Sequence, residues 1–377
     1  MKGRILVSIL MFGSTFCWAG LAEGIAAYEK QEYTVALKEF MPLAEQGNAE
    51  AQYNLGVMFR RGNGVAQDFA QAINWYHKAA DQNNSYALHN LGVMYEQGLG
   101  VPQNNEQAVN WYRIAAELGN VRAQFNLGNM YYQGKSITQD YVQAINWYRK
   151  AAEQDNVDAQ YNLGIMYYSG EGIAQDYVQA ANWLAKAAEK NSAKAQYTLG
   201  TLYYHGQGVP QNYTQAASWF LKAADQGNAF AQAMIAKMYY NDQGVTQDYS
   251  EAAKWFRKAA EQGVTLAQYT IGTMYQLNIG VPKDYTQAFL WLSKAAEQGN
   301  PAAQTNLGIM YYEGQGIAKD YTLAAKWFRK AAEQGESLSQ LRLGQMYEKG
   351  QGVVQDSIEA VDWILKSSKQ QSTPPSN

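Results

Sequence analysis

The chain of 377 residues is longer than one hydrophobic core usually organises, so it contains either several domains or a repeated unit. Trp and Tyr are abundant while Pro is scarce, and this composition favours repetition. The formal net charge of −3 supplies no basic field, which excludes nucleic acid as an expected partner.

The first nineteen residues have the pattern of a secretory signal peptide. Lys2 and Arg4 form a short basic start, an apolar stretch covers residues 5–12, and Ala19 suits the position before a cleavage site. The alternative is a membrane anchor, which needs about 20 apolar residues, and Gly13 interrupts this run. We therefore expect cleavage after about Ala19 and a periplasmic or secreted mature chain without a transmembrane segment. Cleavage would also remove the only cysteine.

The two ends of the remaining chain differ from its middle. Residues 20–50 predict a short helix hairpin, with helices over 21–29 and 33–45, that caps the N-terminal end. Residues 369–377 read KQQSTPPSN, a polar sequence typical of a disordered tail.

Between these ends the sequence repeats with a period of 36 residues, and residues 51–368 contain nine tandem copies. The most regular marker is one tryptophan per copy: Trp75, Trp111, Trp147, Trp183, Trp219, Trp255, Trp291, Trp327 and Trp363. No interval between these tryptophans departs from the period, so the period defines the architecture.

Each repeat predicts a helix hairpin. In the first copy, apolar residues from Ala51 to Phe59 share one helical face, and the glycine-bearing NGVAQ segment then predicts a turn. Asp68 followed three residues later by Gln71 predicts the N-cap of a second helix. Two helices cannot bury their apolar faces alone, so the hairpins must stack on one another.

Small residues at fixed positions allow this stacking to be close. Gly56 recurs in every repeat except the one with Ala236, and an Ala-Ala pair such as Ala79-Ala80 recurs near the end of the second helix. A residue that is identical in every repeat meets the same surroundings in every repeat. We therefore expect the tryptophans to lie in the core between helices; the alternative is a ladder on which a ligand stacks.

The string AQYNLGVMFRRGNGVAQDFAQAINWYHKAADQ resembles a Sel1-like repeat, a relative of the tetratricopeptide repeat with a longer turn inside the hairpin. The resemblance is carried by Leu55-Gly56, Gly62 and Gly64 at the turn, Trp75-Tyr76 and Ala79-Ala80. It covers residues 21–368 and implies an all-α fold, a right-handed α/α superhelical solenoid of such hairpins. Similar proteins are adaptors for protein complexes, and several secreted bacterial ones act at the host interface.

Nothing in the sequence predicts catalysis, a cofactor or a metal. His77, His89 and His205 occupy three different positions of the repeat, so stacking does not align them, and no familiar catalytic or phosphate-binding motif occurs. Cysteine-rich relatives have been associated with penicillin binding and hydrolysis. They carry a disulfide in each repeat and this chain carries none, so a β-lactamase-like hydrolase is only an alternative.

A partner would bind where the repeats differ. Counted from the opening Ala of each repeat, the variable places of the first helix are the fourth, seventh, tenth and eleventh, which share one face. The predicted site residues on this face are Asn90, Asn126 and Asn162 at the fourth place and Tyr132, Tyr168, Tyr204 and Tyr240 at the tenth. In similar solenoids the first helices line the concave groove. Tyr combines apolar area with a hydrogen-bonding tip, which suits an interface.

The alternative for these residues is structural: the tyrosines pack against the next hairpin and the asparagines bond locally. The leading interpretation is a monomeric, non-catalytic adaptor in the bacterial envelope or outside the cell that binds a protein or peptide in this groove. Binding of cell-wall or host glycan on the same surface is a further alternative.

Overall fold

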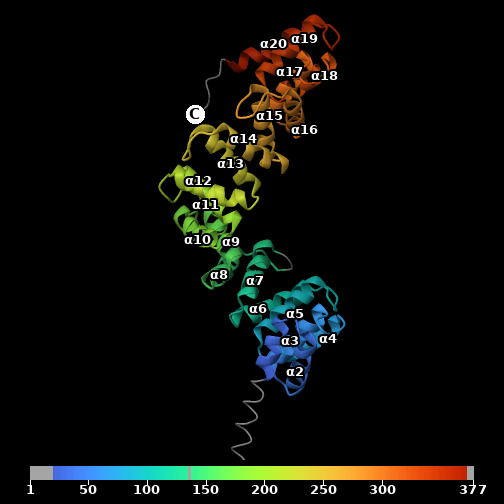
Figure 1. Ribbon diagram of the computed structural model, residues 1–377, viewed down its shortest axis with the longest axis vertical. Coiled ribbons are helices and arrows are strands. Elements are labelled where there is room, and N and C mark those ends of the chain that lie inside the picture. The colour runs from blue at the N-terminus through green and yellow to red at the C-terminus, as the bar shows by residue number, and fades with distance from the viewer. Residues whose placement is uncertain (1–19, 135–136, 372–377) are drawn as a thin grey trace, which may run out of the picture. The chain divides into compact units, whose positions relative to one another are not determined.

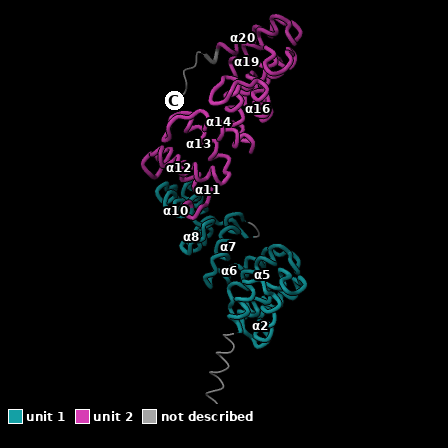
Figure 2. Tube along the Cα trace, viewed as in Figure 1, with its two compact units in different colours: residues 1–187 teal, residues 188–377 magenta. Residues whose placement is uncertain are grey.

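The computed structural model describes residues 20–134 and 137–371, and over these ranges it consists of helices joined by short turns, with no strand (Figure 1). The expected signal peptide of residues 1–19 lies outside the described residues. The described residues form two compact units, one up to Ala187 and one from Ala188, and the division falls within one helix, α10 (Figure 2).

The N-terminal hairpin has the predicted helices, over residues 20–29 and in α2 (Tyr33–Glu45). Nine further hairpins follow. Their first helices are α3 (Ala49–Arg61), α5 (Ser85–Gln97), α7 (Val121–Gln133), α9 (Val157–Ser169), α11 (Ala193–His205), α13 (Ala229–Asn241), α15 (Thr265–Leu277), α17 (Pro301–Glu313) and α19 (Ser337–Lys349). Their second helices are α4 (Phe69–Ala80), α6 (Asn105–Glu117), α8 (Tyr141–Glu153), α10 (Tyr177–Glu189), α12 (Tyr213–Asp225), α14 (Tyr249–Glu261), α16 (Tyr285–Glu297), α18 (Tyr321–Glu333) and α20 (Ser357–Gln371).

Two boundaries differ slightly from the sequence expectation. The first helix of the first repeat begins at Ala49 rather than Ala51, because Asn48 is its N-cap and its side chain accepts a hydrogen bond from the Ala51 amide at 2.9 Å. Helix α20 continues to Gln371, so it includes the first three residues of the segment expected to be a tail. Residues 372–377 lie outside the described residues.

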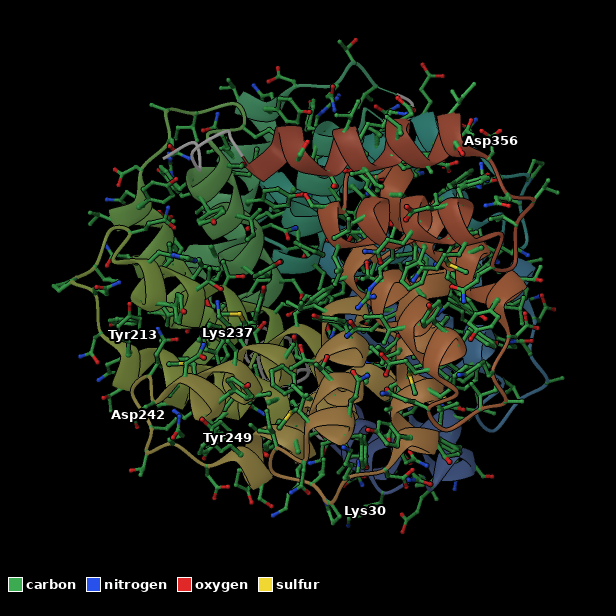
Figure 3. All side chains as sticks on the ribbon, turned by 90° about the horizontal axis from the view of Figure 1, so that it is seen from above. Lys30, Tyr213, Lys237, Asp242, Tyr249 and Asp356 are labelled. Atoms are coloured by element: carbon green, nitrogen blue, oxygen red, sulfur yellow. The ribbon has the colours of Figure 1, made fainter. Side chains whose placement is uncertain are left out.

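The predicted N-caps of the second helices are confirmed. Asp68 Oδ1 accepts the Gln71 amide at 2.9 Å, and the equivalent Asp or Asn caps α6, α8, α12, α14, α16 and α18 in the same way. The first helices end at a left-handed residue, as at Gly62 with φ of 73°. Where the sequence replaces this glycine, Asp242 (labelled in Figure 3) and Asn278 keep the same conformation, with φ of 56° and 63°.

The core of each unit lies between the stacked helices, as the repeated residues predict. Five of the nine repeat tryptophans are buried and the other four are half-buried, so the expectation that they belong to the core is confirmed. In eight of the nine repeats a lysine three residues on covers the indole, as Lys78 covers Trp75 with its Nζ 4.0 Å from the ring centroid; the exception is Trp111, where Ile114 stands at that position. The recurring glycine permits close packing, because a Cβ on Gly56 would lie 2.5 Å from the Tyr76 ring.

Candidate functional site

In the first unit, Tyr132 and Tyr168 are half-buried at the C-terminal ends of α7 and α9. The Tyr132 hydroxyl donates to Glu171 Oε2 in the turn of the next hairpin at 2.8 Å, and its ring centroid lies 5.5 Å from that of Tyr141. The Glu171 hydrogen bond, followed by burial, raises the pKa of Tyr132. Tyr168 packs equivalently on Tyr177, also with 5.5 Å between centroids. These contacts agree with the structural alternative for both residues.

In the second unit, Tyr204 and Tyr240 occupy the same place on α11 and α13. The Tyr204 hydroxyl donates to Gln243 Oε1 at 3.0 Å, and its ring packs against Tyr213 with centroids 5.1 Å apart. Tyr240 packs against Tyr249, with centroids 5.0 Å apart; Tyr213 and Tyr249 are labelled in Figure 3. Each of the four predicted tyrosines is therefore held by a neighbouring aromatic ring while part of its surface stays accessible.

Asn90 and Asn126 meet at the buried side chain of His89, which sequence reasoning did not place in the site. His89 Nδ1 lies 3.3 Å from Asn90 Oδ1, and His89 Nε2 lies 3.3 Å from Asn126 Nδ2. An amide oxygen only accepts and an amide nitrogen only donates, so this arrangement requires the neutral imidazole with its proton on Nδ1. Burial lowers the pKa of His89 to about 4, which keeps this form at neutral pH.

The first unit contains a hollow of about 170 Å³ on the face that the first helices form. It combines polar groups with an apolar floor and is lined by Asn129, Tyr132, Gln133, Tyr148, Asn162, Ile165 and Met166. Asn129 Oδ1 joins three lining residues, because it accepts the Tyr148 hydroxyl at 2.7 Å and the Asn162 amide at 3.5 Å. Two predicted site residues, Tyr132 and Asn162, thus line one hollow.

An equivalent hollow of about 240 Å³ lies in the second unit, between α13 and α15. It is lined by Tyr240, Tyr269, Thr270, Thr273, Met274, Leu277 and Ile279. Tyr240 corresponds to Tyr132 and Thr270 to Asn162, and four of the seven lining positions are common to both hollows. The second one is less polar, because Thr270 replaces Asn162 and no residue equivalent to Asn129 lines it.

Sequence reasoning did not assign five lining residues of the first hollow to the site: Asn129, Gln133, Tyr148, Ile165 and Met166. Two of them, Asn129 and Tyr148, are joined by a hydrogen bond in it. Asn129 is at the seventh place of its helix, a place whose variability indicated exposure although it was not assigned to the site. Tyr148 is the tyrosine of the recurring Trp-Tyr pair and so reads as core. It is indeed buried, and that burial raises its pKa, but its hydroxyl reaches the hollow through Asn129.

Within residues 20–134 and 137–371, no group of three or more His, Cys, Asp and Glu side chains could hold a metal ion. Over the same part of the chain, no helix is both long and apolar enough to cross a membrane. The hollows offer amide and hydroxyl groups beside apolar surface, which is the chemistry of recognition by hydrogen bonding and packing.

The stacked hairpins define the class: this is an all-α helix-hairpin repeat protein with a tetratricopeptide-like architecture. The Sel1 repeat model matches nine consecutive segments of 36 residues, from 49–84 to 337–372, and the chain therefore belongs to the Sel1 repeat family. The matched segments begin with the first helices as the structure defines them.

Two solved structures support this assignment. A protective antigen of uropathogenic Escherichia coli with an SLR fold is 34% identical, with a TM-score of 0.75, 99% of this chain covered and 92% of that chain. A Sel1 repeat protein from Oxalobacter formigenes is also 34% identical, with a TM-score of 0.62, 85% of this chain covered and 91% of that one. No curated protein matches the chain.

Proposed function

We propose that the chain is a non-catalytic scaffold that binds a protein or peptide partner on the face formed by its first helices. The observation that carries the proposal is the hollow of the first unit, where Asn129, Tyr132 and Asn162 surround the apolar surface of Ile165 and Met166. A volume of about 170 Å³ suits one side chain, and the amides can pair with an extended peptide backbone.

The polar groups of this hollow keep hydrogen-bonding capacity for a partner. Asn129 Oδ1 already accepts two hydrogen bonds, but its side-chain nitrogen can donate, and the oxygen of Asn162 can accept. Because Tyr132 is held by Glu171 and Tyr141, it loses little conformational entropy when a partner packs on it. A preorganised aromatic beside amides is a favourable contact for a peptide.

We further propose that the scaffold acts in the periplasm or outside the cell. The basic start, apolar stretch and Ala19 of residues 1–19 support export with cleavage. The similarity to a protective antigen of uropathogenic Escherichia coli is consistent with exposure to a host. N-terminal sequencing of the protein recovered from cell fractions tests this part: a periplasmic or secreted chain that begins at Gly20 supports it, and a cytoplasmic chain that begins at Met1 contradicts it.

The binding test uses a substitution that the repeat itself tolerates. Lys237 stands at the position of Ile165 in a later repeat, so the fold accommodates a lysine there. Ile165→Lys therefore places a charge in the hollow of a chain that we expect to fold. We expect Ile165→Lys to abolish capture of partners by the full-length chain in crosslinked pull-downs from its own cell envelope and from host extracts.

The matched control is Asn146→Lys on the exposed side of α8, where Lys254 occupies the equivalent position. Capture should be unchanged in this variant, and far-UV circular dichroism should report a folded chain for both. If folded Ile165→Lys captures the same partners as the parent chain, the assignment of this hollow is wrong.

A further inference from the structure

The second unit contains a larger hollow on its other side, where α14, α15 and the start of α16 meet. Its volume is about 500 Å³. It is lined mainly by charged and aromatic side chains: Arg257, Glu261, Tyr275, Pro282, Lys283, Asp284, Gln287 and Trp291. None of these residues belongs to the face proposed above for peptide binding.

Trp291 is the unusual member of this wall. Its side chain is only 5% exposed, and its indole Nε1 is buried without any hydrogen-bond partner among the described residues. A buried N–H without an acceptor costs about 1–3 kcal/mol, and most native structures satisfy such groups. The hollow therefore borders an indole whose hydrogen-bonding capacity is unused.

The last repeat shows what satisfies the same indole. There Trp363 Nε1 donates to Glu359 Oε2 at 3.0 Å, and the glutamate precedes the tryptophan by four residues on α20. In the repeat of Trp291 the corresponding residue is Gln287, which is neutral. Glutamine is the common residue at this position, and only Glu251 and Glu359 are acidic there. The indole Nε1 of Trp111, four residues after Gln107, is likewise buried without a partner among the described residues, so the repeat of Trp291 lacks an internal acceptor that most repeats also lack.

A substitution before the N-cap of α16 adds positive charge to the lining of the hollow. Most repeats carry a glutamine immediately before the N-cap, and its side chain donates to a backbone carbonyl of the preceding helix, as Gln355 does to Glu348 O at 2.8 Å. Lys283 replaces that glutamine here, and its ammonium lies 4.7 Å from the centroid of the Tyr285 ring. Lys319 occupies the same place in the next repeat, but only the repeat of Trp291 combines this lysine with a buried, unpaired indole N–H among the described residues.

The other charged side chains that line the hollow either form contacts within the chain or are exposed. Arg257 donates to the Tyr275 hydroxyl at 2.8 Å, and neither Arg257 nor Lys283 forms a salt bridge within the described part of the chain. Asp284 Oδ1 accepts hydrogen bonds from the backbone amides of Thr286 and Gln287 at 2.9 and 3.0 Å. Its carboxylate therefore already serves as the N-cap of α16. Glu261 is exposed at the C-terminal end of α14.

We propose that this hollow is a second binding site, separate from the peptide face, and that it takes a carboxylate. The carboxylate accepts the Trp291 indole N–H in the way that Glu359 accepts that of Trp363, and Lys283 and Arg257 supply the opposing charge. The ligand is an acidic side chain of a bound polypeptide or a free small carboxylate, and both present the same group.

The test follows the indole N–H of Trp291 by ¹H–¹⁵N NMR on the full chain, with its signal assigned by Trp291→Phe. The probes are a capped Gly-Glu-Gly tripeptide, its Gly-Gln-Gly counterpart and glutarate. We expect a saturable downfield shift of this one indole signal with the glutamate peptide and no shift with the glutamine peptide. If glutarate binds with the same affinity as the glutamate peptide, a free small carboxylate is sufficient as the ligand. If glutarate binds more weakly than the peptide, the ligand is an acidic side chain of a polypeptide.

Two variants decide whether the shift reports the proposed contact. Gln287→Glu supplies the internal acceptor found in the last repeat, so its indole signal should move without ligand and peptide binding should disappear. Lys283→Gln restores the common residue and should weaken peptide binding by about two- to fivefold, as for a partly exposed charge pair. Gln215→Glu, at the equivalent position before Trp219, is the control and should leave the Trp291 signal and the affinity unchanged.

The proposal is overturned if the glutamate peptide gives no saturable shift at millimolar concentration or if the glutamine peptide shifts the signal equally. It is also overturned if folded Gln287→Glu binds the peptide as the parent chain does. Capture of partners on the face that contains Ile165 is measured separately, so either site can fail without the other.

Discussion

The side-chain amide of Gln298 donates to Gln268 Oε1 at 2.7 Å, and Gln268 in turn donates its own amide to the carbonyl of Ala260 at 3.1 Å. Gln268 is buried, so this pair satisfies a polar group inside the stack. The same two bonds recur 36 residues earlier and later, at Gln232 with Gln262 and at Gln304 with Gln334. A line of buried amides therefore joins consecutive hairpins.

The first prediction concerns this amide line. Gln268→Leu should lower the free energy of unfolding by about 1 kcal/mol, because the Ala260 carbonyl loses the hydrogen bond from Gln268 and keeps only the one from the Gly263 amide. Leucine fits the site, since Leu88 occupies the same place in the second repeat. The midpoint of urea unfolding, followed by far-UV circular dichroism, is the measurement. Gln298→Ala removes only the exposed partner and should cost less than about 1 kcal/mol; equal effects of the two substitutions would refute a special role for the buried amide.

The second prediction concerns the close packing of Gly56 on Tyr76. An alanine inside a helix is normally favoured over glycine by about 1 kcal/mol. Gly56→Ala should nevertheless destabilise the chain by about 1–3 kcal/mol, because the new Cβ would lie 2.5 Å from the Tyr76 ring. Helix propensity thus predicts that Gly56→Ala stabilises the chain, whereas packing predicts that it destabilises the chain. Thermal unfolding of the variant distinguishes the two. A higher melting temperature in the variant would show that the hairpin relaxes around the extra methyl group.

The third prediction is a pH dependence due to His89. Burial lowers the pKa of this residue to about 4 from an ordinary value of 6.5. Between pH 6.5 and about 4, His89 is therefore protonated in the unfolded chain and neutral in the folded chain. His89 should thus reduce the free energy of unfolding progressively as pH falls from about 6.5 to about 4, by up to ~3 kcal/mol, and should have no such effect above pH 6.5. Urea unfolding at a series of pH values measures the slope.

The control for this prediction is His89→Phe, because Phe125 stands at the same place in the next repeat. The variant cannot be protonated there, so its stability should fall less steeply over the same pH interval. Identical slopes for the two chains would mean that His89 does not contribute to the acid sensitivity.

The fourth prediction concerns the turn at Asn278, which has φ of 63° where most repeats have glycine. Asn278 Oδ1 accepts the Lys283 amide at 3.0 Å, so the side chain offsets the strain of the left-handed conformation. Asn278→Ala should cost about 1–2 kcal/mol, since alanine has the strain without the hydrogen bond. Asn278→Gly should stay within about 0.5 kcal/mol of the parent, and thermal melts of the three chains provide the comparison.

Several features of the fold follow from the sequence because they repeat. The period of Trp75 predicts the hairpins, Asp68 predicts where the second helix begins, and Gly56 predicts a close approach that the Tyr76 ring makes. A residue repeated every 36 positions sees the same neighbours each time, so its role can be inferred without coordinates. Helix termini are equally local, since a cap bonds to an amide only three residues away.

The candidate sites depended on contacts between repeats. The sequence indicated that Tyr132 and Asn162 lie on a variable face, but it did not reveal that Tyr132 bonds to Glu171, that Tyr148 reaches Asn129, or that the indole N–H of Trp291 is buried without a partner among the described residues. Such contacts depend on how far one hairpin is shifted and rotated against the next. Periodicity alone determined the helices and their core; the packing of neighbouring hairpins decided which polar groups are paired and which hollows remain open.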